Sequence, residues 1–187
     1  MPSSQPPPNR GPKAGPANRA ALLAAARTLF GRDGYRVPLS LIAREAGVGQ
    51  GVLYRHFPTR LELAYAVFDE NFTALEEAAA TLKGPDAFVG LWRMLIGYTV
   101  ESTAFVDMVI DAREKLPDDV ASERLTRLIE RPLRDAAAAG LADPSWTTDD
   151  LILVLHMVHG VVTANPDHRG AATARALGLI DRRLVVS

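Results

Sequence analysis

An all-α fold of about nine helices is predicted by three features of the 187-residue sequence. After Asn18, apolar residues recur at spacings of three and four through most of the chain, which is typical of amphipathic helices. Glycine or proline interrupts this pattern where helices should end, for example at Gly34 and Pro58. Residues 42–57 have the spacing of a helix-turn-helix. We therefore expect a three-helix amino-terminal domain followed by a larger helical domain.

The composition limits the classes of protein to which the chain can belong. Hydrophobic residues make up 48% and charged residues 23%, which is typical of a soluble globular protein. The absence of cysteine excludes disulfides and thiolate chemistry and fits a reducing cytosol. We expect no signal peptide and no membrane span, because no apolar run approaches the roughly 20 residues that cross a bilayer. These features predict a cytoplasmic protein.

Charge is distributed unevenly along the chain. Residues 1–61 hold nine basic and two acidic residues, a net charge of +7, whereas the whole chain carries −1 and the remainder therefore −8. A cationic head on an acidic body suits a head that binds duplex DNA. A chance division of surface charge is the alternative.

The first segments are a disordered arm and an amphipathic helix. Residues 1–17 are rich in proline and are expected to be disordered. A helix should begin with Asn18 as its N-cap and end at Gly34, where Tyr35 can fold back on Phe30. A second helix should open at Pro38, because proline suits a first helical position.

The segment from Ala43 to Phe57 predicts the helix-turn-helix. Ala43 is small where a following helix must cross closely, and Gly47 supplies the positive φ of a tight turn. Val48 and Leu53 then fill the space between the helices. The third helix, 49–57, should expose a face of small and hydrogen-bonding side chains without acidic residues, which fits a major groove about 12 Å wide. This face carries Gln50, Gly51, Tyr54 and Arg55.

The rest of the chain is expected to be helical. A linking fourth helix covers 61–81, with Thr59 and Glu62 as a capping box. Further helices are expected at 86–103, 106–115, 118–140, from the capping residue Thr147 onward and at 168–184. The helix at 86–103 should carry an apolar stripe that includes Phe88 and Trp92. We assign 18–62 to the helix-turn-helix domain and 82–187 to an effector-binding and dimerisation domain.

The eighth helix predicts a dimer interface. Its segment from Leu151 to Val162 is apolar on nearly every side, so it must be covered on two sides. The domain core can cover one side and a second copy of the chain the other, in a two-fold arrangement with the ninth helix. A single core helix covered within one chain is the alternative. The candidate interface residues are Val154, Val158, Val161, Ala174, Leu177 and Gly178.

Residues 18–72 resemble the DNA-binding domain of the TetR/AcrR-type transcriptional regulators. The resemblance rests on Ala-Ala-Arg-Thr-Leu-Phe (25–30), Asp-Gly-Tyr (33–35), Ile-Ala-Arg-Glu-Ala-Gly-Val (42–48), Leu-Tyr-Arg-His-Phe (53–57) and Thr-Arg-Leu-Glu-Leu (59–63). It implies a regulator, usually a repressor, that binds a palindromic operator in double-stranded DNA as a homodimer and responds to a small-molecule effector. It implies the same helix pair for dimerisation, and no cofactor is expected.

The resemblance also assigns roles to individual residues. Gln50, Gly51 and Val52 fall where the family reads base edges. Tyr54, His56 and Arg60 match positions that hold backbone phosphates, and Ser40 lies where the second helix approaches the backbone. Two departures affect phosphate contacts: Gly49 replaces the usual serine cap, and Val37-Pro38 replace the usual threonines. For Tyr54 and His56, partial burial against the first helix is the alternative role.

The effector candidates are mostly apolar residues of the second domain with a few polar side chains among them, which is the usual composition of a ligand site. Each taken alone also fits a plain core position. They are Trp92, Leu95, Tyr98, Thr99, Met108, Ile129, His156 and His159.

Two other classes of function fit parts of the sequence. His156 and His159 lie three residues apart and could bind a metal with Asp107, Asp111 or Glu114, as in a metal-responsive regulator or a helical metalloenzyme. No His-Glu-x-x-His, Gly-x-Ser-x-Gly or phosphate-loop motif is present, so no enzyme is predicted and no metal site is assigned. A helix-turn-helix module that binds only protein is the other rival, and the basic head argues against it.

Overall fold

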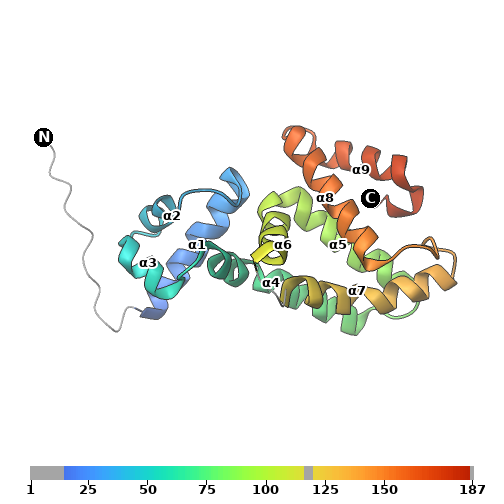
Figure 1. Cartoon of the computed structure of the whole chain (residues 1–187), viewed down its shortest axis with the longest axis horizontal. Helices are drawn as coiled ribbons and strands as arrows, with labels where there is room; N and C mark the ends of the chain where they lie inside the picture. Colours follow the sequence, from blue (N-terminus) through green and yellow to red (C-terminus); the bar gives the residue numbers. More distant parts are fainter. Residues whose placement is uncertain (1–14, 116–119, 186–187) are drawn as a thin grey trace, which may run out of the picture. The chain divides into compact units, whose positions relative to one another are not determined.

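The computed structural model describes residues 15–115 and 120–185, and all regular elements among them are helical (Figure 1). They divide into two compact units, one up to Asp69 and one from Glu70, so the division falls inside helix α4. The helices are α1 (Gly15–Asp33), α2 (Leu39–Glu45), α3 (Gln50–His56), α4 (Arg60–Thr81), α5 (Asp86–Glu101), α6 (Thr103–Lys115), α7 (Val120–Ala138), α8 (Thr148–Ala164) and α9 (Arg169–Ile180), followed by the 3-10 turn η2 (Arg182–Leu184). The predicted all-α class is confirmed.

Helix α1 forms the centre of the amino-terminal unit and packs against both α2 and α3. The apolar stripe predicted from the sequence is buried as expected, and its members are Leu22, Ala25, Ala26, Leu29 and Phe30. Gly34 ends the helix with φ of +80°, a backbone conformation that glycine adopts without strain. Its N–H donates to the Phe30 carbonyl at 3.1 Å, and the rings of Phe30 and Tyr35 lie 5.9 Å apart. The predicted helix end is therefore correct.

The predicted start of α1 is wrong. The helix begins at Gly15, so residues 15–17 belong to it and not to the expected arm, whose residues 1–14 lie outside the described part of the chain. Asn18 is a buried residue inside the helix and not its N-cap. Pro16 explains the difference, since proline is well suited to a first helical turn, where its missing N–H has no intrahelical partner to lose. The proline-rich composition concealed this turn.

Helix α4 contributes to both units, and its second half is attached to α7. Arg124 donates to the two carboxylate oxygens of Glu76 at 2.5 and 2.8 Å, and its guanidinium carbon lies 4.9 Å from the centre of the Phe72 ring. The hydrogen bond from Arg124 lowers the pKa of the Glu76 carboxyl. At its beginning, α4 is capped by the Thr59 hydroxyl, which accepts from the Glu62 N–H at 3.1 Å. The double charge-assisted bond between Arg124 and Glu76 fixes both the distance and the orientation of α4 and α7.

Helix α5 forms the core of the carboxy-terminal unit, with α6, α7, α8 and α9 packed around it (Figure 1). The stripe expected on α5 is buried, with Phe88 and Trp92 stacked at 6.2 Å. Helix α8 begins at the predicted capping residue, where Thr147 and Asp150 bond reciprocally, and these bonds lower the pKa of the Asp150 carboxyl. Helix α9 ends at Ile180, earlier than expected, because Asp181 caps the separate turn η2 by accepting from the Arg183 N–H at 2.8 Å.

Candidate nucleic-acid interface

The turn between α2 and α3 has the chemistry that the sequence predicts. Gly47 adopts a φ of +66°, and Val48 donates to the Ala43 carbonyl at 3.0 Å, which closes the turn. Ala43 is 1% exposed and Leu53 is fully buried, so the small residue allows the close approach and the leucine fills the space. These contacts hold α3 rigidly against α2 and α1, which leaves its opposite face open.

That open face of α3 carries the residues expected to contact bases and phosphates. Gln50, Gly51 and Arg55 are exposed, Val52 is half-buried, and the Arg55 Nε donates to the Gly51 carbonyl at 3.1 Å. Tyr54 is 51% exposed, which favours a role at the surface over burial against α1. Ser40, in the first turn of α2, is also exposed. The face therefore presents one amide, one phenol and one guanidinium on a short helix.

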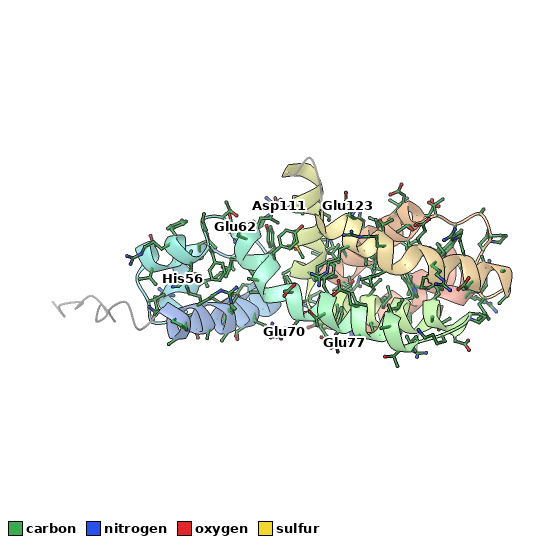
Figure 2. The ribbon with its side chains drawn as sticks, turned by 90° about the horizontal axis from the view of Figure 1, so that it is seen from below. His56, Glu62, Glu70, Glu77, Asp111 and Glu123 are labelled. Atoms are coloured by element: carbon green, nitrogen blue, oxygen red, sulfur yellow. The ribbon has the colours of Figure 1, made fainter. Side chains whose placement is uncertain are left out.

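His56 lies at the carboxyl end of α3 and is labelled in Figure 2. It is half-buried, and its ring centre lies 6.3 Å from that of Phe57. Gly49 is the N-cap at the other end of the helix and provides no side-chain cap, as expected from the missing serine hydroxyl. The backbone N–H groups of this first turn are left without a capping side chain.

Arg60 has a role inside the unit that the sequence did not reveal. Its Nη1 donates to the carbonyl oxygens of Tyr35 and Val37 at 2.6 and 2.5 Å, and its guanidinium carbon lies 5.6 Å from the centre of the Tyr35 ring. The side chain thus ties the start of α4 to the connection between α1 and α2. A phosphate contact by Arg60 stays a prediction, and the observed bonds make it a positioning residue as well.

A second arginine, Arg19 on α1, was absent from the predicted site. Its guanidinium carbon lies 5.4 Å from the centre of the Phe57 ring, directly after the carboxyl end of α3. No sequence motif signals this contact, because the two residues are far apart in the chain. The surroundings are cationic: residues 15–61 hold seven arginines and two acidic residues. The carboxy-terminal unit carries acidic residues such as Glu70, Glu77 and Glu123, which are labelled in Figure 2.

Most of the effector candidates are buried in the carboxy-terminal unit. Five of them are almost completely buried: Trp92, Leu95, Thr99, Met108 and Ile129. The Trp92 Nε1 donates to the Leu184 carbonyl at 3.0 Å, and the Thr99 hydroxyl donates to the Leu95 carbonyl at 2.9 Å. Tyr98 is half-buried beside Phe105, and desolvation, with a smaller contribution from Glu101, raises the pKa of its phenol.

The two histidines of α8 are half-buried. His159 Nε2 lies 3.1 Å from an Asp107 carboxylate oxygen and so connects α8 to α6. Within the described residues, no three histidine, aspartate or glutamate side chains are grouped so that they could hold a metal ion. The side chain of Glu114, one of the carboxylates considered as a partner for the two histidines, lies outside the described residues, so the metal-responsive alternative is not tested.

The predicted dimer residues differ in their exposure within one chain. Val154 and Val158 are at most 4% exposed, because α5, α6, α7 and α9 cover α8 within one chain. Leu177 on α9 is fully buried, and α9 packs against α8, α5 and η2. Val161, Ala174 and Gly178 are half-buried. Other large apolar side chains of the same two helices are the exposed ones: Leu153, Met157, Leu179 and Ile180.

Comparisons with known proteins agree with this fold. The family model for bacterial regulatory proteins of the tetR family matches residues 22–67. The comparison with curated proteins finds no match.

No described helix is long and apolar enough to cross a membrane.

Among solved structures, the TetR family protein CprB from S. coelicolor A3(2) is 22% identical, with 92% of this chain and 91% of that chain covered and a TM-score of 0.61. A gamma-butyrolactone receptor, an ArpA-like protein, is 22% identical, with 91% and 94% covered and a TM-score of 0.54. A TetR transcriptional regulator from Streptomyces coelicolor is 31% identical over 87% of this chain and 95% of its own, with a TM-score of 0.48. The first two likenesses show the fold.

Proposed function

Because residues 22–67 match the family model for bacterial regulatory proteins of the tetR family, we propose that the chain is a transcriptional repressor of this family, which binds a palindromic operator as a homodimer. The observation that carries the proposal is the exposed face of α3 with Gln50, Tyr54 and Arg55, held on a head rich in arginine. A helix of this kind can enter the major groove while phosphate contacts set its register. We place the protein with the chromosome in the cytoplasm and assign it no enzymatic role.

The proposal predicts different effects for two residues of α3. Tyr54→Ala is expected to weaken binding to all duplexes, because a phosphate contact carries no sequence information. Gln50→Ala is expected to relax base preference by about 1–3 kcal/mol at one position, provided that its amide contacts a base edge through two hydrogen bonds. Fluorescence anisotropy with a duplex selected from a randomised pool, and with point variants of that duplex, measures both effects.

Tyr54→Phe is the matched control, because it keeps the exposed ring and removes only the hydroxyl. It should lose nearly as much affinity as Tyr54→Ala when the hydroxyl donates to a phosphate. Equal affinity of wild type and Tyr54→Ala for the selected duplex would refute the assignment of this face to DNA.

We propose that the homodimer forms through the exposed apolar side chains of α8 and α9. Leu153 and Met157 lie one turn apart on α8, and Leu179, the most exposed of the large apolar residues at 81%, lies on the neighbouring α9. Apolar side chains gathered on two adjacent helices favour burial against a second copy. Two copies would place two α3 helices on one palindrome.

We further propose that a small, largely apolar effector binds in the carboxy-terminal unit near Trp92 and releases the DNA. Helix α4 belongs to both units, and the Glu76–Arg124 pair attaches its second half to α7. A ligand that prefers an altered packing around α7 would therefore act on α4, the helix that begins in the amino-terminal unit. By linkage, bound DNA would lower the affinity for the ligand by the same factor. Since one structural neighbour is a gamma-butyrolactone receptor, gamma-butyrolactones are the first compounds to test.

Trp92 is expected to report effector binding. The sequence holds two tryptophans, so in a Trp146→Phe background the fluorescence arises from Trp92 alone. A compound that frees the duplex should change this fluorescence over the same concentration range, and Trp92→Phe should blunt the release while DNA binding persists. A compound that releases DNA equally from wild type and Trp92→Phe, without a change in fluorescence, would place the ligand elsewhere.

A further inference from the structure

We propose that Arg19 binds a backbone phosphate of duplex DNA at the carboxyl end of α3, beside His56. The inference rests on the proposed DNA-binding function and extends its site to α1, which lies outside the helix-turn-helix. It assigns to the first helix a phosphodiester contact that the sequence motifs do not indicate.

The first argument is the position of Arg19. Its guanidinium lies against the ring of Phe57, the residue that directly follows α3, and the same ring contacts His56. Helix α1 packs against α3, so this placement belongs to the folded core of the unit. Two cationic or hydrogen-bonding side chains from different helices, Arg19 and His56, therefore meet at one edge of the proposed recognition helix.

The second argument is the state of the guanidinium. Arg19 is exposed, and within the described residues it forms no hydrogen bond or ion pair. A cation–π contact attracts the charge to the ring face and does not use the N–H donors. The cation–π contact thus holds the side chain in place, and within residues 15–115 and 120–185 its N–H donors have no partner. A guanidinium in this state is suited to a phosphate, with which it can form two parallel charge-assisted bonds.

Other arginines of the head either form hydrogen bonds or ion pairs already or are held by no described group. Arg60 donates to two backbone carbonyls, Arg27 donates to the Val67 carbonyl at 2.7 Å, and Arg32 is paired with Asp33 at 2.7 Å. Arg36 and Arg44 are exposed, but the described part of the chain shows no ring or bond that holds them. Among the arginines of residues 15–61, Arg19 combines a ring contact with donors that bond to no described residue.

The salt dependence of DNA binding tests the proposal. Each phosphate contact contributes roughly 0.9 to the slope of log K against log salt, because it releases condensed counterions. For a dimer with two copies of Arg19, Arg19→Gln should therefore reduce the slope by about 1.8. Affinity for the selected duplex and for an unrelated duplex should fall to a similar extent, since the contact carries no sequence information. Fluorescence anisotropy across a salt series measures both quantities.

Two further variants separate a phosphate contact from other effects. Arg93→Gln removes the same charge from an exposed position on α5 and should leave the slope unchanged. Arg19→Lys keeps the charge and should retain most of the slope. Circular dichroism should show equal helix content in all variants, because both positions are exposed.

Three results are decisive against the idea. A steep slope in the wild type that Arg19→Gln leaves unchanged would overturn this inference alone. An Arg19→Lys variant as defective as Arg19→Gln would show that packing on Phe57, and not charge, matters. A wild-type protein whose affinity for duplexes does not depend on salt would refute the proposed DNA-binding function itself.

Discussion

Replacing Leu53 with alanine is expected to lower the free energy of unfolding of the amino-terminal unit by about 2–5 kcal/mol. Leu53 is fully buried where α3 packs against α1 and α2. Its truncation removes apolar contacts and leaves a cavity that the short helix cannot easily collapse. A small unit has a limited apolar core, so a loss of this size approaches its whole stability. DNA binding should be lost as well, because α3 is no longer held in its position.

Hydrogen exchange measured by mass spectrometry tests this expectation region by region. Faster exchange should be confined to residues 15–69, and the peptides of α5 to α9 should keep their wild-type protection. Leu95→Ala is the matched control, since Leu95 is equally buried in the carboxy-terminal unit and should accelerate exchange there. If Leu53→Ala binds duplexes with wild-type affinity and shows unchanged protection, then Leu53 does not position α3.

The turns and apolar stripes could be predicted because their causes are local. Gly34 and Gly47 have positive φ, and a glycine after an apolar helical pattern is a direct signal for such a conformation. The stripe from Leu22 to Phe30 depends only on helical spacing, and all of its members are buried. The cap of α8 at Thr147 likewise lies directly before the helix, and its bonds to Asp150 stay within four consecutive residues. Such features need no knowledge of tertiary packing.

The roles of the arginines could not be predicted for the opposite reason. Arg60 contacts residues 23 and 25 positions away, and Arg19 contacts the ring of Phe57, which directly follows another helix. Arginine has a long, flexible side chain, so its partner is chosen by the tertiary arrangement and not by its neighbours in sequence. A motif can therefore mark a position as cationic without showing whether the charge faces inward or toward a ligand.

The faces of α8 illustrate a related limit. A helix that is apolar on nearly all sides indicates double coverage but does not say which side meets the core. Val154 and Val158 are buried within the chain, whereas Leu153 and Met157 on the same helix are 57% and 44% exposed. Polar residues normally indicate which face points outward, but on α8 the exposed face carries the apolar residues Leu153 and Met157. The structure supplies the distinction through the helices that cover α8.

A double substitution, Leu153→Glu with Met157→Glu, is expected to convert the dimer to monomers. Both side chains are exposed in one chain, so the substitution should leave the monomer folded. In a dimer, however, each would bury an unpaired carboxylate, which costs several kcal/mol. Light scattering should report a monomer mass, and circular dichroism should report unchanged helix content. Affinity for the palindrome should fall by about 10²–10⁴-fold, because the second head is no longer delivered at high effective concentration.

The comparison with a single half-site makes this result specific to dimerisation. Wild type and the double variant should bind a half-site duplex with similar affinity, since each head is intact and only the linkage between two heads is lost. Ala138→Glu places one such charge at an exposed position on α7 and should leave both the mass and the palindrome affinity unchanged. A wild-type protein that is monomeric at micromolar concentration, or a double variant that remains dimeric, would show that Leu153 and Met157 do not form the interface.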